Sequence, residues 1–123
     1  MGCATGERSM VETRNASPSR GGIYRVSLNP TLGHEQQEYR PVLVISPDAY
    51  NAKTGLAIVC PITSQVKGYP FEVAFSSGKI SGAVLTDQPR TLDWRARKFA
   101  HVCKLDMAVY EEVRAKILAL LEK

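Results

Sequence analysis

Residues 33–41, with the sequence GHEQQEYRP, contain side chains that could together cleave RNA without a metal ion. That reaction needs a base for the 2′-hydroxyl proton, an acid for the departing 5′-oxygen and a cation near the phosphorus. His34 and Glu35 are candidate bases. Arg40 is a candidate phosphate ligand, and Pro41 biases its backbone toward an extended conformation. Spacing alone leaves open a solvated, inert Glu–Arg pair, which is the commoner outcome in surface loops.

The cysteines and histidines argue against a disulfide framework and against a metal site. Cys3, Cys60 and Cys103 are widely spaced and form no CxxC motif. The two histidines, His34 and His101, form neither an HxH nor an HExxH motif. We therefore predict no metal ion and no cofactor, so that any hydrolytic chemistry comes from organic side chains. Cys60 and Cys103 are predicted to be buried strand residues.

Positive charge is concentrated in residues 90–104. The whole chain carries a net charge of +4, and this segment alone, with five basic residues against Asp93, carries the same net charge. Such a concentration can attract a polyanion or an acidic protein. A solvated basic face is the alternative that charge alone leaves open.

The apolar pattern predicts a leader, a series of short strands and one C-terminal helix. Residues 1–20 lack apolar periodicity and are predicted to be a disordered leader, so the folded domain is expected over residues 21–123. Apolar runs bounded by Gly, Pro, Asn or Ser predict strands at residues 23–28, 42–45, 56–62, 71–75, 83–85 and 99–103, without helices between them. After Asp106, a plausible N-cap, a helix is predicted from apolar residues three and four positions apart: Met107, Tyr110, Val113, Ile117 and Leu121.

Strands of this length and spacing are typical of an antiparallel barrel or a strongly curved sheet. Residues 42–45 and 57–60 are apolar throughout, so we expect both faces of these strands to be covered, one by the core and the other by a helix or a second subunit. The expected fold class is a β-dominated α+β domain. No stretch approaches the roughly 18 apolar residues of a membrane span, and the N-terminus lacks the apolar core of a secretory signal, so a cytoplasmic protein is expected.

Five ordered groups of motifs resemble the MazF/PemK family of toxins, over residues from about 21 to the C-terminus. They are GIY at 22–24, NPT at 29–31, the stretch from GHEQ at 33–36 to RPVLV at 40–44, PIT at 61–63, and DQPRTLD at 87–93. KGYPFEV at 67–73 and WRAR at 94–97 are similar to the MazF branch in particular.

The resemblance implies an SH3-like barrel of the CcdB/PemK type, closed by a C-terminal helix. It also implies a homodimer that cleaves single-stranded RNA at a short sequence, leaving a 2′,3′-cyclic phosphate and a 5′-hydroxyl. The expected partner is a cognate acidic, MazE-like antitoxin. By match to the family's EQxxxRP and PxT motifs, Arg40 and Thr63 are expected to act at the scissile phosphate. Glu35 is expected to act as base or orienting group, with His34 and Asp87 as possible supporting residues.

The residues expected to bind RNA lie in the loops around that site and in the basic segment. Bases of single-stranded RNA are recognised by hydrogen bonds to their edges and by stacking on flat side chains. Tyr39 is a candidate for stacking, whereas Trp94 is expected to pack at the dimer interface or under the basic segment. The proposed RNA-binding set is Thr31, Leu32, Gln36, Ser64, Lys67, Gln88, Arg95 and Arg97.

Two departures from the family pattern keep alternatives open. Glu38 stands where many relatives carry glycine, which adds negative charge beside Arg40. Leu85 stands where the PemK branch has an arginine, so a site centred on Asp87 is disfavoured. A catalytically inactive RNA- or antitoxin-binding relative is one alternative. A CcdB-type protein that binds DNA gyrase is another, although such proteins end in Trp-Gly-Ile and this chain ends in Leu-Glu-Lys.

Overall fold

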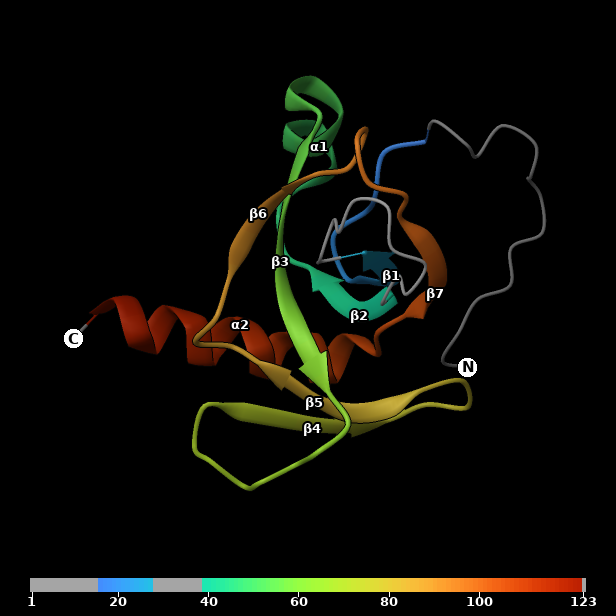
Figure 1. Cartoon of the computed structure of the whole chain (residues 1–123). Coiled ribbons are helices and arrows are strands. Elements are labelled where there is room, and N and C mark those ends of the chain that lie inside the picture. The colour runs from blue at the N-terminus through green and yellow to red at the C-terminus, as the bar shows by residue number, and fades with distance from the viewer. Residues whose placement is uncertain (1–15, 28–38, 123) are drawn as a thin grey trace.

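The computed structural model describes residues 16–27 and 39–122 of the chain (Figure 1). These residues form seven strands and two helices. In chain order they are β1 (Gly22–Ser27), β2 (Tyr39–Val44), α1 (Asp48–Thr54), β3 (Leu56–Thr63), β4 (Glu72–Ser76), β5 (Ser81–Leu85), β6 (Arg90–Asp93), β7 (Ala100–Lys104) and α2 (Met107–Glu122). Strands occupy the six predicted positions, and the predicted C-terminal helix is present.

The strands form one curled antiparallel sheet, in agreement with the expected SH3-like barrel. The order is β4-β5-β3-β2-β1-β7, and β6 also pairs with β3. The long strand β3 therefore has two neighbours on one edge: its first half pairs with β6 and its end pairs with β5. Residues 86–89 lie between β5 and β6 and interrupt the pairing with β3.

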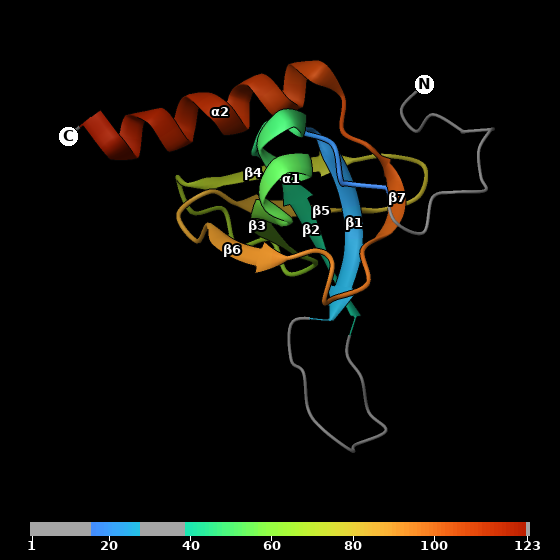
Figure 2. The same ribbon diagram turned by 90° about the horizontal axis from the view of Figure 1, so that it is seen from above.

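The central strands are covered on both faces, as the uniformly apolar runs predict. One buried cluster includes Ile23, Leu43 and Cys60, and α2 packs against it through Val113 and the half-buried Tyr110. Figure 2 shows α2 lying along this side of the curled sheet. The second cluster covers the other face and comprises Tyr24, Val26, Val42, Val44, Ala57, Val59, Leu92 and Trp94, with Phe99 packed against it. Cys60 and Cys103 are fully buried, which confirms their predicted environment.

The expectation that no helix lies between the strands is wrong, because α1 separates β2 from β3. This helix has seven residues and buries only Asn51, so it has no apolar periodicity to detect. It ends at Gly55, whose φ of 77° is a left-handed conformation that favours glycine. The Gly55 N–H donates to the carbonyl of Asn51 at 3.0 Å.

The side chain of Asn51 is the centre of a buried polar network. Its Oδ1 accepts a hydrogen bond from Ser46 Oγ, and its Nδ2 donates to the carbonyl oxygen of Pro18 at 2.8 Å. Trp94 Nε1 donates to the carbonyl oxygen of Asn51 at 2.8 Å. Four segments of the chain therefore meet at one fully buried residue, where these hydrogen bonds are protected from water.

The first described residues belong to the folded domain and not to a leader. Pro18 is fully buried, the Ser19 N–H donates to the Tyr24 hydroxyl at 3.0 Å, and the Arg20 N–H donates to Asp48 Oδ1 at 2.8 Å. The boundary expected at residue 20 is therefore a few residues too late. The leader prediction for residues 1–15 lies outside the described residues.

Within the described parts of the chain, no helix is long and apolar enough to cross a membrane.

Candidate active site

Arg40 and Thr63 lie on adjacent strands at the same end of the sheet. Val42 with Pro61 is the outermost pair between β2 and β3, and Arg40 and Thr63 each lie two residues beyond it, where Thr63 pairs with Ala83 of β5. Residues two apart on a strand share a face, so Arg40 and Thr63 lie on the face of Val42, which is that of the second buried cluster. Arg40 is exposed at the open end of this face, and Thr63 is half-buried. The two residues that the family match assigns to the scissile phosphate thus lie at the same end of the β2–β3 pair.

The other residues predicted in the first loop lie outside the described residues. These are Thr31, Leu32, His34, Glu35 and Gln36, together with Glu38. Tyr39, the first residue of β2, has 43% of its surface exposed. Its ring is therefore accessible to a base, and the stacking role stays a prediction.

Thr63 opens onto a pocket of about 220 Å³, which we call the Thr63 pocket. Its lining joins the end of β3, the loop that follows, the start of β4 and the segment after β5. The lining residues are Thr63, Gln65, Lys67, Tyr69, Phe71, Glu72, Leu85 and Gln88. Three predicted site residues, Thr63, Lys67 and Gln88, therefore line one cavity, and Ser64 is exposed beside it.

The loop between β3 and β4 is held in place by two side chains that bond its backbone. Glu72 Oε1 accepts hydrogen bonds from the N–H groups of Lys67 and Gly68 at 3.0 and 2.9 Å. Thr63 Oγ1 accepts one from the Gln65 N–H at 3.0 Å. This bond uses the Thr63 oxygen as an acceptor, so its hydroxyl proton remains available for donation.

Sequence reasoning missed the flat aromatic wall of this pocket. The rings of Tyr69 and Phe71 lie 5.4 Å apart with an angle of 33° between their planes, and Tyr69 is 50% exposed. Gln65 adds a side-chain amide to the lining. The signal for this wall is the pair of aromatic residues two positions apart in the KGYPFEV motif at residues 67–73.

Residues 86–89, between β5 and β6, present Gln88 to the pocket and leave Asp87 exposed. The segment is fixed by Thr86, whose hydroxyl donates to the Phe71 carbonyl at 2.7 Å. Burial raises the pKa of the Cys60 thiol to about 12, and the carboxylate of Asp87 adds to the rise. Cys60 is therefore a protonated, inert core thiol and not a nucleophile.

Gly82 allows β5 to approach the end of β3 very closely. A Cβ atom built on Gly82 would lie 2.4 Å from the carbonyl oxygen of Thr63, a distance that real Cβ atoms do not show. The neighbouring residue, Ala83, is the strand partner of Thr63. Glycine at position 82 therefore sets the position of the backbone that carries Thr63.

Two arginines of the basic segment, Arg95 and Arg97, contact the protein itself. Trp94 is 9% exposed, and the Arg95 guanidinium lies 5.1 Å from the centre of its ring. Trp94 therefore packs under the basic segment, which was one of the two environments expected for it. Arg95 Nη2 also donates to the Ala52 carbonyl at 3.4 Å. Arg97 Nη1 donates to the carbonyl oxygen of Ser27 at the end of β1.

No group of three or more His, Cys, Asp or Glu side chains able to hold a metal ion occurs among residues 16–27 and 39–122.

Comparison with known proteins places this arrangement in one family. Residues 19–121 match the family model described as PemK-like, MazF-like toxin of type II toxin–antitoxin system. The endoribonuclease toxin MazF of Escherichia coli K12 is 39% identical over 104 residues, which cover 85% of this chain and 94% of that protein.

Two solved structures from Deinococcus radiodurans are similar over their whole length. MazF alone superimposes with a TM-score of 0.76 at 44% identity, covering 87% of this chain and 98% of the other. A MazE–MazF structure gives a TM-score of 0.77 at 42% identity, covering 85% and 96%. The family model spans most of the chain and the match to the curated relative is nearly complete, so the chain belongs to the PemK-like, MazF-like toxins of type II toxin–antitoxin systems.

Proposed function

We propose that this protein is the endoribonuclease toxin of a toxin–antitoxin pair and that it cleaves single-stranded RNA at the end of the β2–β3 pair. The observation that carries the proposal is the placement of Arg40 and Thr63 at the same end of the β2–β3 pair, with Thr63 opening onto a pocket large enough for part of a nucleotide. Relatives 39% and 36% identical bear the names endoribonuclease MazF and endoribonuclease PemK. These names support a nuclease over the gyrase-binding alternative.

The proposed reaction is an internal displacement at phosphorus. The 2′-oxygen attacks the phosphorus and loses its proton to a base, while the bond from phosphorus to the 5′-oxygen breaks and that oxygen gains a proton. The products are a 2′,3′-cyclic phosphate and a 5′-hydroxyl, and no water or oxidant is consumed. Family resemblance makes Glu35 the base or an orienting group, and this residue lies outside the described residues.

Arg40 and Thr63 have distinct proposed roles at the phosphate. A guanidinium is a planar cation with a fork of N–H donors, so Arg40 suits stabilisation of the charge that builds on the non-bridging oxygens. The hydroxyl of Thr63 can donate its proton to one of the same oxygens while its oxygen keeps the bond from Gln65. The Thr63 pocket then receives a neighbouring base, with Gln65 and Gln88 as amides for its edge.

The direct test is digestion of defined single-stranded and duplex RNAs by purified protein in EDTA. We expect fragments with a 5′-hydroxyl and a cyclic phosphate from the single strands, and intact duplexes. Sequencing the 5′ ends of the fragments gives the recognition sequence. Intact single-stranded RNA across many sequences would leave only a binding function.

The proposed partner is an acidic, partly disordered antitoxin that covers the site. A MazE–MazF structure of 42% identity supports an antitoxin for this chain. A second copy of the chain and a cytoplasmic location are part of the same proposal. Gel filtration with and without the antitoxin encoded beside the toxin gene tests the assembly, and loss of RNA cleavage on mixing tests the inhibition.

Lys67 should contribute an electrostatic contact to RNA that disappears at high salt. Each phosphate neutralised on a single strand adds about 0.7 to the slope of log affinity against log salt concentration. Lys67→Ala is therefore expected to reduce that slope by about 0.7, as measured by fluorescence anisotropy with a labelled oligonucleotide. Lys53→Ala is the matched control, because Lys53 is exposed on α1, at the far end of β3 from the loop that holds Lys67 (Figure 1). An equal change of the salt slope in both variants would show that the effect comes from the net charge of the protein and not from a contact of Lys67 with RNA.

A further inference from the structure

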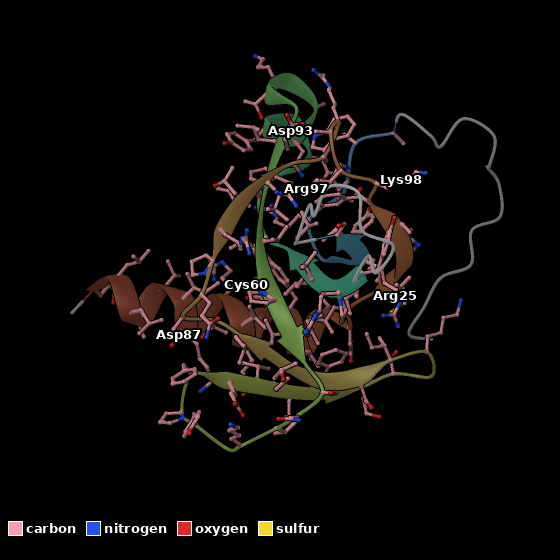
Figure 3. The ribbon with its side chains drawn as sticks, viewed as in Figure 1. Arg25, Cys60, Asp87, Asp93, Arg97 and Lys98 are labelled. Atoms are coloured by element: carbon pink, nitrogen blue, oxygen red, sulfur yellow. The ribbon has the colours of Figure 1, made fainter. Side chains whose placement is uncertain are left out.

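The segment between β6 and β7 crosses the face of the sheet that carries Arg40. It begins with Trp94 in the second buried cluster and continues to Phe99, which packs on the same cluster. In Figure 3, Asp93, Arg97 and Lys98 are labelled along this connection, between the ribbons of β6 and β7. The segment therefore lies on the same side of the central strands as the candidate active site.

A tight turn fixes the start of this segment. Asp93 Oδ1 accepts hydrogen bonds from the N–H groups of Arg95 and Ala96 at 2.9 and 3.1 Å. The Arg97 N–H donates to the Asp93 carbonyl at 3.0 Å. Trp94 secures the turn to α1 through its bond to the Asn51 carbonyl. The backbone of Arg97 is thus held by this turn, which restricts where its side chain can reach.

The side chain of Arg97 reaches the last residue of β1. Its guanidinium donates to the carbonyl oxygen of Ser27, seventy residues away in the chain. Arg97 is half-buried, whereas its neighbours Arg95 and Lys98 are exposed. This burial and this direct bond distinguish Arg97 from a solvated arginine that is available to bind a phosphate.

Ser27 is paired with Tyr39, so the bond acts where both ends of the β1–β2 connection meet the sheet. The next pair along the ladder is Val26 with Arg40. A shift of the Ser27–Tyr39 pair must therefore move the backbone of Arg40, which is adjacent to it on β2. The contact with Ser27 lies one residue pair away from the candidate phosphate ligand.

We infer that Arg97 is a positioning residue for the proposed RNA cleavage: by holding the Ser27 carbonyl, it fixes the open end of the β1–β2 pair and with it Arg40. The inference rests on the proposed function. It replaces the RNA-binding role expected for Arg97 from its charge. The guanidinium contributes mainly a directed N–H donor, and its positive charge is secondary.

The test compares Arg97→Ala, Arg97→Gln and Arg97→Lys, with Lys98→Ala as the control for loss of a neighbouring exposed charge. Positioning predicts that Arg97→Ala lowers kcat roughly 10- to 100-fold while KM changes little, because the reacting groups are misplaced but the RNA still binds. Glutamine keeps a donor without charge, so Arg97→Gln should recover part of the rate, as should Arg97→Lys. A phosphate contact predicts instead that only lysine rescues, that KM rises and that the salt slope falls.

Amide hydrogen exchange supplies a readout that does not depend on cleavage. The amides at the end of β1 and the start of β2 should exchange faster in Arg97→Ala than in the wild type, and at wild-type rates in Lys98→Ala. Unchanged exchange at these strand ends would overturn the inference, whatever the activity. If the wild-type protein fails to cleave RNA, the proposed function falls, and the exchange measurement still decides whether Arg97 holds the strand ends.

Discussion

Arg40→Ala is expected to fold normally and to lose RNA cleavage. Removing one preorganised donor to a developing oxyanion typically costs about 10²- to 10³-fold in rate, and a lost full charge should place this variant at the upper end of that range. Arg40 is exposed, so its truncation leaves no cavity in the core. Single-turnover cleavage of a labelled oligonucleotide measures the effect, and circular dichroism checks the fold.

Arg25→Ala is the matched control for this experiment. Arg25 is an exposed arginine on the neighbouring strand, paired with Pro41, and it lies on the opposite face of the sheet from Arg40. We expect near wild-type cleavage from Arg25→Ala. Arg40→Lys should recover only part of the activity, because a point charge does not reproduce the planar fork of donors. Full activity in Arg40→Ala would place the catalytic centre elsewhere.

Gly82→Ala is expected to damage both stability and activity. The new Cβ would lie 2.4 Å from the Thr63 carbonyl oxygen, so β5 and the end of β3 must move apart. Overpacking of this kind costs roughly 1 to 3 kcal/mol of folding free energy. Because Thr63 moves with its strand, cleavage should fall by more than the loss of folded protein explains.

The control for that variant is Gly78→Ala, in the turn between β4 and β5. A Cβ on Gly78 meets nothing within 4 Å, so this substitution should leave the urea midpoint and the cleavage rate nearly unchanged. The two variants are compared by urea unfolding and by cleavage at a temperature where both are folded. Equal stability of Gly82→Ala and wild type would show that the strands separate at no cost.

Six of the seven strands and the C-terminal helix could be predicted because their side-chain periodicity is local, whereas β6 was missed. Each predicted strand is a short apolar run with a turn residue at its ends, and α2 repeats its apolar residues at helical spacing. The same pattern overstated the buried face of α2: Val113 is buried, but Met107 and Leu121 are exposed by 63% and 76%. Spacing shows which residues share a face of the helix, whereas the extent of the sheet beneath α2 decides how much of that face is buried.

The parts that could not be predicted depend on contacts between distant residues. The helix α1 is held by Asn51, a polar residue whose partners Pro18 and Trp94 are 33 and 43 positions away. The contact of Arg97 with Ser27 is a further example, since positive charge alone suggested RNA binding. For the candidate site, the family motifs predict roles for Arg40 and Thr63, whereas the Tyr69–Phe71 wall required knowledge of how the loop after β3 folds back.

The hydrogen bond from Asn51 to the carbonyl of Pro18 limits how far the N-terminal end of the chain can be shortened. A shortened form beginning at Gly21 would delete that acceptor and leave Asn51 Nδ2 with its 3.2 Å bond to the Ser46 carbonyl, at a cost of about 1 to 3 kcal/mol. Affinity tags and fusion partners at the N-terminal end should therefore precede residue 16 and be joined by a spacer, so that residues 18–20 can still pack against α1.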